Sequence, residues 1–162
     1  MRTLTGSMYH DSLPVLQVIL SFNSELTNTH FLKVMVDLRD KWDKYRKNTQ
    51  VLSQEDATVL SYTYPFPVRN RRISEKVYKY EESSSVRIFS HSVDLPIEVT
   101  DEEDGVVLFS LGDLRRHTGK TTVTFTSQVD LKLPPTKRSE ELISKMGAEW
   151  AQLCFKALDS PI

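Results

Sequence analysis

Trp42-Asp43-Lys44-Tyr45 and Tyr64-Pro65-Phe66-Pro67-Val68-Arg69-Asn70-Arg71 are the two stretches that decide the fold predicted for this chain. The second follows the first by nineteen residues. Pro65 and Pro67 fix their own φ angles and exclude a helix, so the second stretch predicts a rigid turn. No generic fold requires a Trp-Asp pair followed by an aromatic and proline turn closed by Asn-Arg, and this combination is therefore informative.

The residues before Trp42 predict a strand and then a helix. Residues 15–22 are rich in β-forming side chains, and Asn23 or Ser24 followed by Glu25 is typical of a helix start. Apolar side chains then recur at helical spacing, at Phe31, Val34, Met35 and Leu38. We expect a helix that buries this stripe and ends near Trp42.

The following part of the chain, up to residue 131, has the composition of β structure. We expect strands at residues 49–52, 58–64, 73–80, 86–92, 106–111 and 121–131, joined by hairpins into an antiparallel sheet. The last strand has the clearest pattern, because Val123, Phe125, Val129 and Leu131 share one parity and threonines occupy the other. This alternation predicts one buried face and one wetter face.

A long helix is expected after Pro134-Pro135, from Ser139 to near Pro161. Its apolar stripe consists of Leu142, Met146, Trp150, Leu153 and Ala157. A helix of this length spans about 30 Å, enough to cross the concave face of a curved sheet. The predicted fold class is α+β, a helix-grip arrangement in which a curved antiparallel sheet closes over the C-terminal helix and leaves a hollow for an apolar ligand.

The two opening stretches, taken with this order of elements, resemble the START lipid-transfer domains, and among them most closely the members that carry phosphatidylcholine. Ser92-Val93-Asp94-Leu95-Pro96 and Leu131-Lys132-Leu133-Pro134 resemble two further segments of the family. The resemblance covers residue 15 to the end of the chain. It implies non-catalytic lipid binding and intermembrane lipid transfer, with transient contact at membrane surfaces and no cofactor.

The resemblance also implies the organisation of the chain. Residues 1–14 are expected to be an N-terminal tail, and residues 15–162 a START-like domain that lacks the usual N-terminal helix and first strands. A sheet without its first strands exposes an edge, so a homodimer formed through that edge is a reasonable hypothesis.

Ligand preference is expected to differ from that of a phosphatidylcholine carrier. The three positions that hold an aromatic cage for choline are Leu60, Ile73 and Gly112 here, and a cage without rings loses its cation–π attraction. Arg39 matches the arginine that meets the lipid phosphate, so a phospholipid head group is expected, while an exposed structural arginine is an equal alternative. Arg72 and Leu108 depart from the family pattern in charge and indicate a divergent site.

The resemblance supplies the remaining expected site residues. The lipid-binding set consists of Arg39, Leu60, Tyr62, Tyr64, Ile73, Phe125, Met146 and Trp150. A lid over the cavity mouth is expected at Pro65, Phe66, Pro67, Val68, Arg69 and Asn70, with a plain proline turn as the alternative. Release of the lipid would follow movement of this loop and of the C-terminal helix. Trp42 is expected to serve in packing rather than in the ligand wall.

Composition excludes several other classes of function. Twenty-one basic and twenty-two acidic residues leave no broad basic field for nucleic acid. The single cysteine, Cys154, fits a reducing compartment, and a cytoplasmic location is expected. The four histidines show no metal-ligand spacing, and no nucleophile and base can be paired, so neither metal nor catalytic residues are expected. The alternatives are a regulatory lipid-sensing or protein-interaction module and, less favoured, a helix-grip enzyme.

Overall fold

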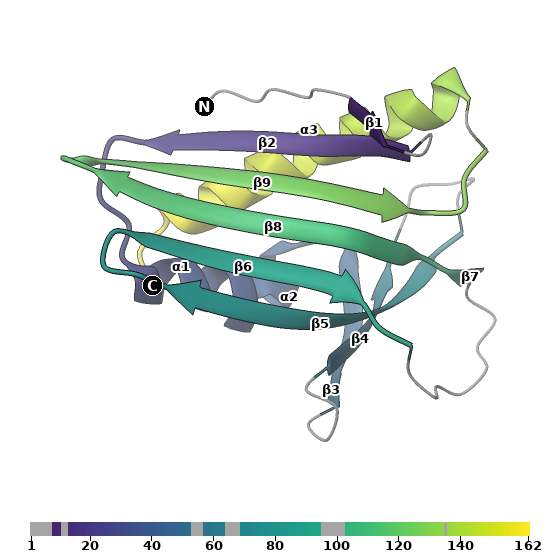
Figure 1. Ribbon diagram of the computed structural model, residues 1–162, viewed down its shortest axis with the longest axis horizontal. Helices are drawn as coiled ribbons and strands as arrows, with labels where there is room; N and C mark the ends of the chain where they lie inside the picture. The colour runs from purple at the N-terminus through teal and green to yellow at the C-terminus, as the bar shows by residue number, and fades with distance from the viewer. Residues whose placement is uncertain (1–7, 11–12, 53–56, 64–68, 95–102, 135) are drawn as a thin grey trace.

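A computed structural model describes residues 8–10, 13–52, 57–63, 69–94, 103–134 and 136–162, apart from a few side chains. Its main element is a curved sheet in the order β1-β2-β9-β8-β6-β5-β4-β3, with β7 beside β5 (Figure 1). The strands are β1 (Met8–His10), β2 (Leu13–Phe22), β3 (Arg46–Leu52), β4 (Ala57–Tyr62), β5 (Arg71–Glu81), β6 (Ser85–Ser92), β7 (Glu103–Asp104), β8 (Val106–His117) and β9 (Lys120–Asp130). All pairs are antiparallel except β5 with β7. Met8–His10 falls in the segment expected to be a tail, and β2 begins two residues before the expected strand.

The strand predicted at residues 106–111 corresponds to β8, and the prediction was too short. The strand continues through Gly112-Asp113 to His117, where a tight turn with Gly119 at φ 71° leads into β9. The paired segment beyond residue 111 was missed because Gly-Asp is typical of a turn. Of the inward positions predicted for the last strand, Val123 and Leu131 are buried and Phe125 and Val129 line the cavity, whereas Gln128, on the face predicted to be wetter, is buried as well.

The helix before Trp42 is divided into three pieces, α1 (Asn28–Leu32), the π-helical segment η1 (Lys33–Asp37) and α2 (Arg39–Trp42). Its predicted start at Asn23 or Ser24 was wrong. Thr27 caps α1 instead, because the segment before it is bound to Thr121 of β9. The Thr121 hydroxyl donates to Ser24 O and accepts from Leu26 N. The predicted end near Trp42 is confirmed, and Phe31, Val34 and Met35 are buried as expected.

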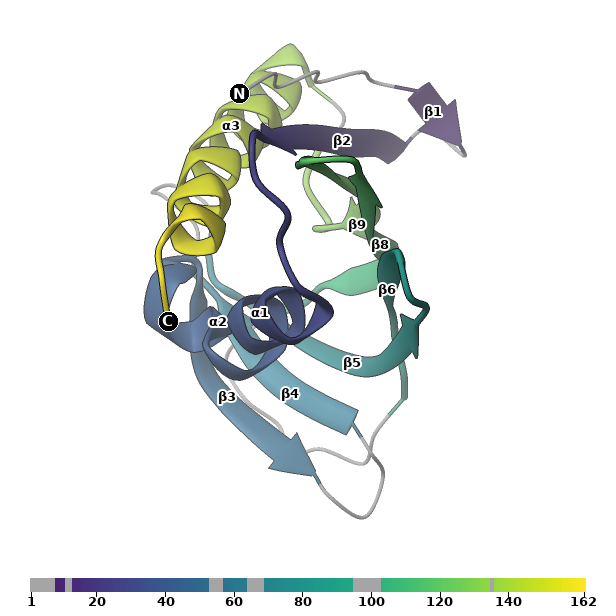
Figure 2. The same cartoon turned by 90° about the vertical axis from the view of Figure 1, so that its left-hand side faces the viewer.

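The C-terminal helix α3 (Lys137–Asp159) lies across the concave side of the sheet, and α1 and α2 close the same side further along (Figure 2). It begins two residues before the expected start, with Thr136 as its N-cap. Its most deeply buried residues are Gly147, Ala151, Cys154 and Leu158, one position later than most of the predicted stripe. Small side chains there let the helix approach the sheet closely: a Cβ on Gly147 would lie 2.9 Å from Leu16 Cδ1.

The hydrophobic core occupies the end of the fold where α3 finishes. Phe31, Val34 and Met35 meet Val18, Leu20, Phe22, Val86, Leu114 and Val123 of the sheet and Ala151, Cys154 and Leu158 of α3. Trp42 packs against this cluster, and its Nε1 donates to Val34 O, in agreement with its expected packing role. At the opposite end, under the first half of α3, the described residues leave a cavity.

Candidate functional site

A cavity of about 540 Å³ lies between the concave face of the sheet and α3. Its apolar wall includes Leu16, Val18, Met35, Ile73, Val77, Ile88, Val107, Phe125, Val129, Leu131, Ile143, Met146 and Trp150. Strand residues enter this wall because alternate side chains of β2, β5, β8 and β9 point inward. Serines 90, 110 and 127 add small polar groups. The sheet and α3 thus border a half-open, largely apolar cavity beside the core.

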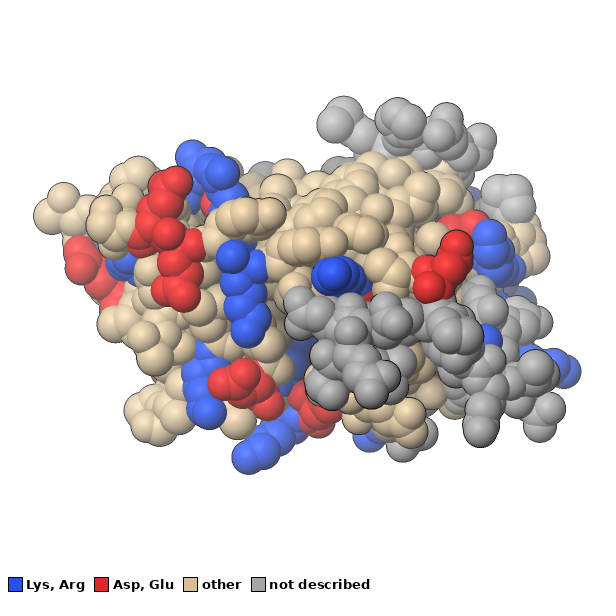
Figure 3. All heavy atoms as spheres, turned by 60° about the horizontal axis from the view of Figure 1, so that its bottom comes forward, with Lys and Arg blue, Asp and Glu red and all other residues tan. Residues whose placement is uncertain are grey.

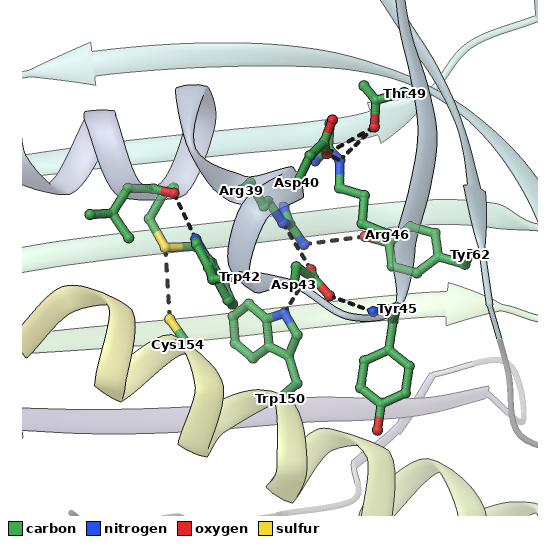
Figure 4. A network of polar contacts seen from close by, with 12 residues as sticks. Arg39, Asp40, Trp42, Asp43, Tyr45, Arg46, Thr49, Tyr62, Trp150 and Cys154 are labelled. Carbon is green, nitrogen blue, oxygen red and sulfur yellow. Dashed lines mark hydrogen bonds and ion pairs between the residues drawn. The ribbon is translucent and has the colours of Figure 1, made fainter. Parts of the chain in front are cut away.

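One end of the cavity carries paired charges (Figure 4). Arg39 Nε lies 3.2 Å from Asp43 Oδ2, and Arg39 Nη2 donates to the Tyr62 hydroxyl at 3.2 Å. Arg46 Nε lies 2.8 Å from Asp40 Oδ1, and Arg46 Nη1 lies 3.7 Å from Glu75 Oε1. Two guanidinium groups therefore face three carboxylates at this end.

Asp43 joins the charged end to α3. Its carboxylate, fully buried, accepts from Trp150 Nε1 at 3.0 Å and from the backbone N–H of Tyr45 at 3.2 Å, besides Arg39 (Figure 4). Glu149, the neighbour of Trp150, accepts from the Tyr45 hydroxyl and pairs with Lys44 at 2.7 Å. The Trp42-Asp43-Lys44-Tyr45 stretch is therefore the contact between α3 and the corner that follows α2.

Burial and charge shift the pKa values of this cluster. Burial by itself would lower the pKa of the Arg39 guanidinium, but its interactions with Tyr62, Asp43 and Glu75 outweigh burial and raise that pKa. Burial raises the pKa of Tyr62 to about 12; Asp43 and Glu75 add to the rise and Arg39 opposes it. Arg39 therefore stays a cation and Tyr62 a neutral phenol at physiological pH.

The structure gathers most of the predicted site residues around one space. Arg39, Tyr62, Ile73, Phe125, Met146 and Trp150 all line the cavity. Leu60 is fully buried on the same face of β4 as Tyr62, but it is not among the lining residues. Tyr64 and four residues of the expected lid, Pro65, Phe66, Pro67 and Val68, lie outside the described residues. Arg69 and Asn70, which complete that loop, are exposed.

The positions that depart from the family pattern fall in different surroundings. Gly112 lines the cavity, and a Cβ there would lie 2.9 Å from Phe125 Cε1. The absence of a side chain at Gly112 therefore leaves the space that the Phe125 ring occupies. Leu108 is 44% exposed, because a β-bulge between Val107 and Phe109 leaves it on the outer side of β8. Arg71, next to Arg72, is buried, and its Nε donates to Leu131 O at 2.8 Å.

Sequence reasoning missed Arg46 and Glu75 as site residues. Glu75 shares its parity on β5 with Ile73 and Val77, both in the cavity wall. A charged residue at an inward position of a strand was the signal available in the sequence. Arg46 stands at the start of β3 without such a pattern, and only the pairing of distant strands shows its partners.

In the described part of the chain, none of the helices is long and apolar enough to cross a membrane. Within the same residues, no group of three or more His, Cys, Asp or Glu side chains is placed to hold a metal ion. On the face drawn in Figure 3, acidic and basic side chains lie interspersed.

Comparison with known proteins establishes the fold. No protein-family profile matches the chain, and no curated protein matches it. Human StAR-related lipid transfer protein 5 is similar in structure, with a TM-score of 0.80 at 14% identity over 98% of this chain and 84% of that chain. Human STARD10 has a TM-score of 0.65 at 18% identity, over 93% and 73% of the two chains.

A bacterial structure is similar as well. The STAR-related lipid transfer protein from Xanthomonas axonopodis has a TM-score of 0.71 at 13% identity, over 98% of this chain and 91% of that chain. At these identities the likeness concerns the fold alone. The predicted α+β helix-grip architecture of START-related lipid transfer domains is therefore confirmed.

Proposed function

We propose that this protein is a non-catalytic lipid carrier, which binds one lipid in the cavity between the sheet and α3 and exchanges it at membranes. The observation that carries the proposal is the cavity of about 540 Å³ with a largely apolar wall. Burial of each methylene group stabilises a bound lipid by about 0.8 kcal/mol, so an acyl chain or ring system gains ample affinity in such a wall. Two of the similar structures described above, the human StAR-related protein 5 and the Xanthomonas axonopodis protein, carry the words lipid transfer in their names.

The cavity favours a carrier over a protein-interaction module. A module that only docks partners needs no interior space, and a filled interior would have supported it. A phospholipid, whose phosphate would meet Arg39, is the cargo that the family resemblance suggests. Arg39 already has Asp43 and Tyr62 as partners, so cargo identity has to be decided by experiment.

Exchange of the cargo requires that α3 separate from the sheet or shift along it. Polar contacts between α3 and the α1–β3 region are those of Trp150 with Asp43, of Glu149 with Tyr45 and Lys44, and of the Leu158 carbonyl with His30 Nε2 at 2.8 Å. The end of α3 also packs into the apolar core through Ala151, Cys154 and Leu158, whereas its first half lies over the cavity. We therefore propose α3 as the moving element.

Lipid extraction and transfer assays test the proposal. Protein purified without detergent would be analysed by native mass spectrometry for a bound lipid and then incubated with donor and acceptor vesicles that carry labelled lipids. A one-to-one lipid complex and protein-dependent transfer are expected. If no lipid co-purifies and no labelled lipid of any class moves, the carrier function is wrong.

A further inference from the structure

We infer that the mouth of the cavity docks on anionic lipid bilayers, through a basic rim carried by the η1–α2 segment, β3 and β5. The docked mouth would serve the proposed carrier function, on which the inference rests, by facing the lipid surface from which cargo is taken. Membrane contact is thereby assigned to residues other than those of α3 and of the expected lid.

The open side of the cavity is marked by the lining residues that solvent reaches. Among the described residues that line the cavity, those in the exposed class are Asp37, Asp40, Val51 and Lys79. Asp37 ends η1, Asp40 belongs to α2, Val51 to β3 and Lys79 to β5. The lining residues of α3 are buried or half-buried. The mouth therefore opens between the η1–α2 segment and strands β3 and β5.

The part of the chain that borders the mouth is basic, although the whole protein is nearly neutral. Residues 33–51 contain six Lys or Arg against three Asp, a net charge of +3, whereas the whole chain has a net charge of −1. This segment carries η1, α2 and most of β3, and α2 lies beside β3 at the end of the sheet opposite to β2 (Figure 2). The exposed lysines of the basic rim are Lys33, Lys41, Lys44, Lys47 and Lys79. A local basic surface of this kind attracts the anionic lipids of a membrane.

Three cations of the basic rim are available to lipid head groups. Lys41, Lys47 and Lys79 form no ion pair with a carboxylate of the described residues. The acids beside them, Asp37 and Asp40, are already paired with bases at 3.3 and 2.8 Å. Each uncompensated lysine near an anionic surface strengthens binding by about fivefold. Several such lysines at one mouth are enough to orient the protein on a bilayer.

Val51 adds an apolar contact at the same mouth. Its side chain is 75% exposed, the largest exposed fraction among the large apolar residues in the described part of the chain. It lies on β3, the last strand in the sheet order, and it also lines the cavity. An apolar side chain beside lysines suits the boundary between head groups and acyl chains. With Val51 at this boundary, a lipid passes from the bilayer to the apolar wall without crossing bulk water.

Lys44 connects the basic rim to α3. Its Nζ lies 2.7 Å from Glu149 Oε2, and both side chains are partly exposed. A lipid phosphate that binds Lys44 competes with Glu149 and weakens a contact that holds α3 in place. A bilayer that binds the shifted form of α3 better than the resting form moves the equilibrium toward it. Docking at the mouth therefore favours the movement that cargo exchange requires.

Vesicle binding by a pair of double variants tests the basic rim. Wild-type protein would be sedimented with phosphatidylcholine vesicles that contain or lack phosphatidylserine, and binding should require phosphatidylserine and weaken in high salt. Lys41→Gln combined with Lys47→Gln removes two uncompensated cations, so binding to the anionic vesicles should fall by about tenfold or more. Lys137→Gln combined with Arg138→Gln is the matched control, because it removes two exposed bases at the start of α3. The control should change binding by less than about twofold.

A fluorophore that responds to solvent polarity tests which side of the protein meets the bilayer. It would be attached to Val51→Cys or, in a second protein, to Ser144→Cys at an exposed position of α3. Cys154 is fully buried and should escape labelling in the folded protein. Emission from the label at residue 51 should shift to the blue on anionic vesicles, and emission from the label at residue 144 should not.

The outcomes separate this inference from the proposed function. Binding that does not depend on phosphatidylserine, equal losses in the two double variants, or a spectral shift at residue 144 as large as that at residue 51 would overturn the inference. Transfer of labelled lipid would be measured with the same vesicles, and transfer by the wild type would leave the carrier function standing in each of these cases. A wild type that docks through the basic rim but transfers no lipid would overturn the carrier function and leave the docking surface.

Discussion

Trp150 Nε1 donates a hydrogen bond of 3.0 Å to Asp43 Oδ2, and this contact joins the middle of α3 to the corner between α2 and β3. The same carboxylate oxygen lies 3.2 Å from Arg39 Nε, a cation in the cavity wall. The position of the covering helix and the charged end of the cavity therefore depend on one buried side chain.

Replacement of Asp43 should be strongly destabilising. In Asp43→Ala the guanidinium of Arg39 keeps its burial but loses its carboxylate, and breaking a buried pair from one side typically costs about 3–5 kcal/mol. Urea unfolding would measure the free energy of unfolding. Asp37→Ala is the control, since Asp37 forms an exposed pair with Lys33 and should change stability by about 0.5 kcal/mol or less. Equal effects of the two variants would contradict the role of Asp43.

Tyr62 should lose its proton at a higher pH than an ordinary tyrosine, and its ionisation should destabilise the folded protein. Burial, with Asp43 and Glu75, raises its pKa from an ordinary value of 10.0 to about 12 in the folded protein. Since the folded state holds this proton more tightly than the unfolded state, the contribution to stability is complete below pH 10 and is lost as pH rises through about 12. Absorbance at 295 nm should show a step near pH 12 in the wild type.

Tyr62→Phe should remove the absorbance step near pH 12. The free energy of unfolding of this variant should decrease less steeply above pH 10 than that of the wild type. The pKa of Tyr45 is also raised, by burial and by its hydrogen bond to Glu149, so Tyr45→Phe should be titrated in parallel. A late step that persists unchanged in Tyr62→Phe would show that another tyrosine produces it.

Gly112→Ala should disturb the cavity wall more than Gly147→Ala. At Gly112 the new Cβ would lie 2.9 Å from a Phe125 ring that also meets Trp150 edge-on at 5.0 Å. Overpacking of this kind costs about 1–3 kcal/mol and pushes the ring toward the cavity, so lipid uptake should fall as well. At Gly147 the atoms nearest the new Cβ belong to the flexible side chain of Leu16, with both methyl groups at 2.9 Å, and alanine is the better helix former. Calorimetry and lipid extraction on both variants would check this order.

Filling the cavity should separate stability from lipid binding. Ser127→Leu on the inner face of β9 adds apolar volume to the cavity, so lipid uptake should fall several-fold while the free energy of unfolding stays the same or rises. Thr124→Leu, on the outer face of the same strand, is the matched control and should leave uptake unchanged. Undiminished uptake in folded Ser127→Leu would place the lipid elsewhere.

Association through the edge of β2 stays a prediction. β1 pairs with β2 only at Leu13, Pro14 and Val15, and within the described residues no strand pairs with the outer edge of the other seven residues of β2. An uncovered edge can pair with a second chain. Light scattering at tens of micromolar should give a dimer mass, and substitution of Ile19 by proline should shift the protein to monomer. A wild-type monomer at these concentrations would exclude dimerisation at this edge.

Periodicity was sufficient for much of the fold. Burial of Val123 on β9 and of Phe31, Val34 and Met35 in the predicted stripe is confirmed, because it depends only on which side of a local element faces the core, while Leu38, the fourth residue of that stripe, is half-buried. The exact contact face of α3 was displaced by one residue, since Gly147 and Ala151 allow a close approach that a count of large side chains does not reveal. The π-helical turn at Lys33–Asp37 has no periodic signal of its own.

The amino-acid sequence by itself predicted the order of the main elements and, through the family resemblance, a candidate lipid-binding set of Arg39, Leu60, Tyr62, Tyr64, Ile73, Phe125, Met146 and Trp150. Only the tertiary structure decided that Arg39 and Arg46 face Asp43, Asp40 and Glu75, and that a bulge leaves Leu108 outside. The periodicity of apolar side chains is a local property that can be read directly from the order of amino acids in the sequence. Charge pairing and cavity volume arise from strand register and helix approach across long sequence separations, which no local pattern encodes.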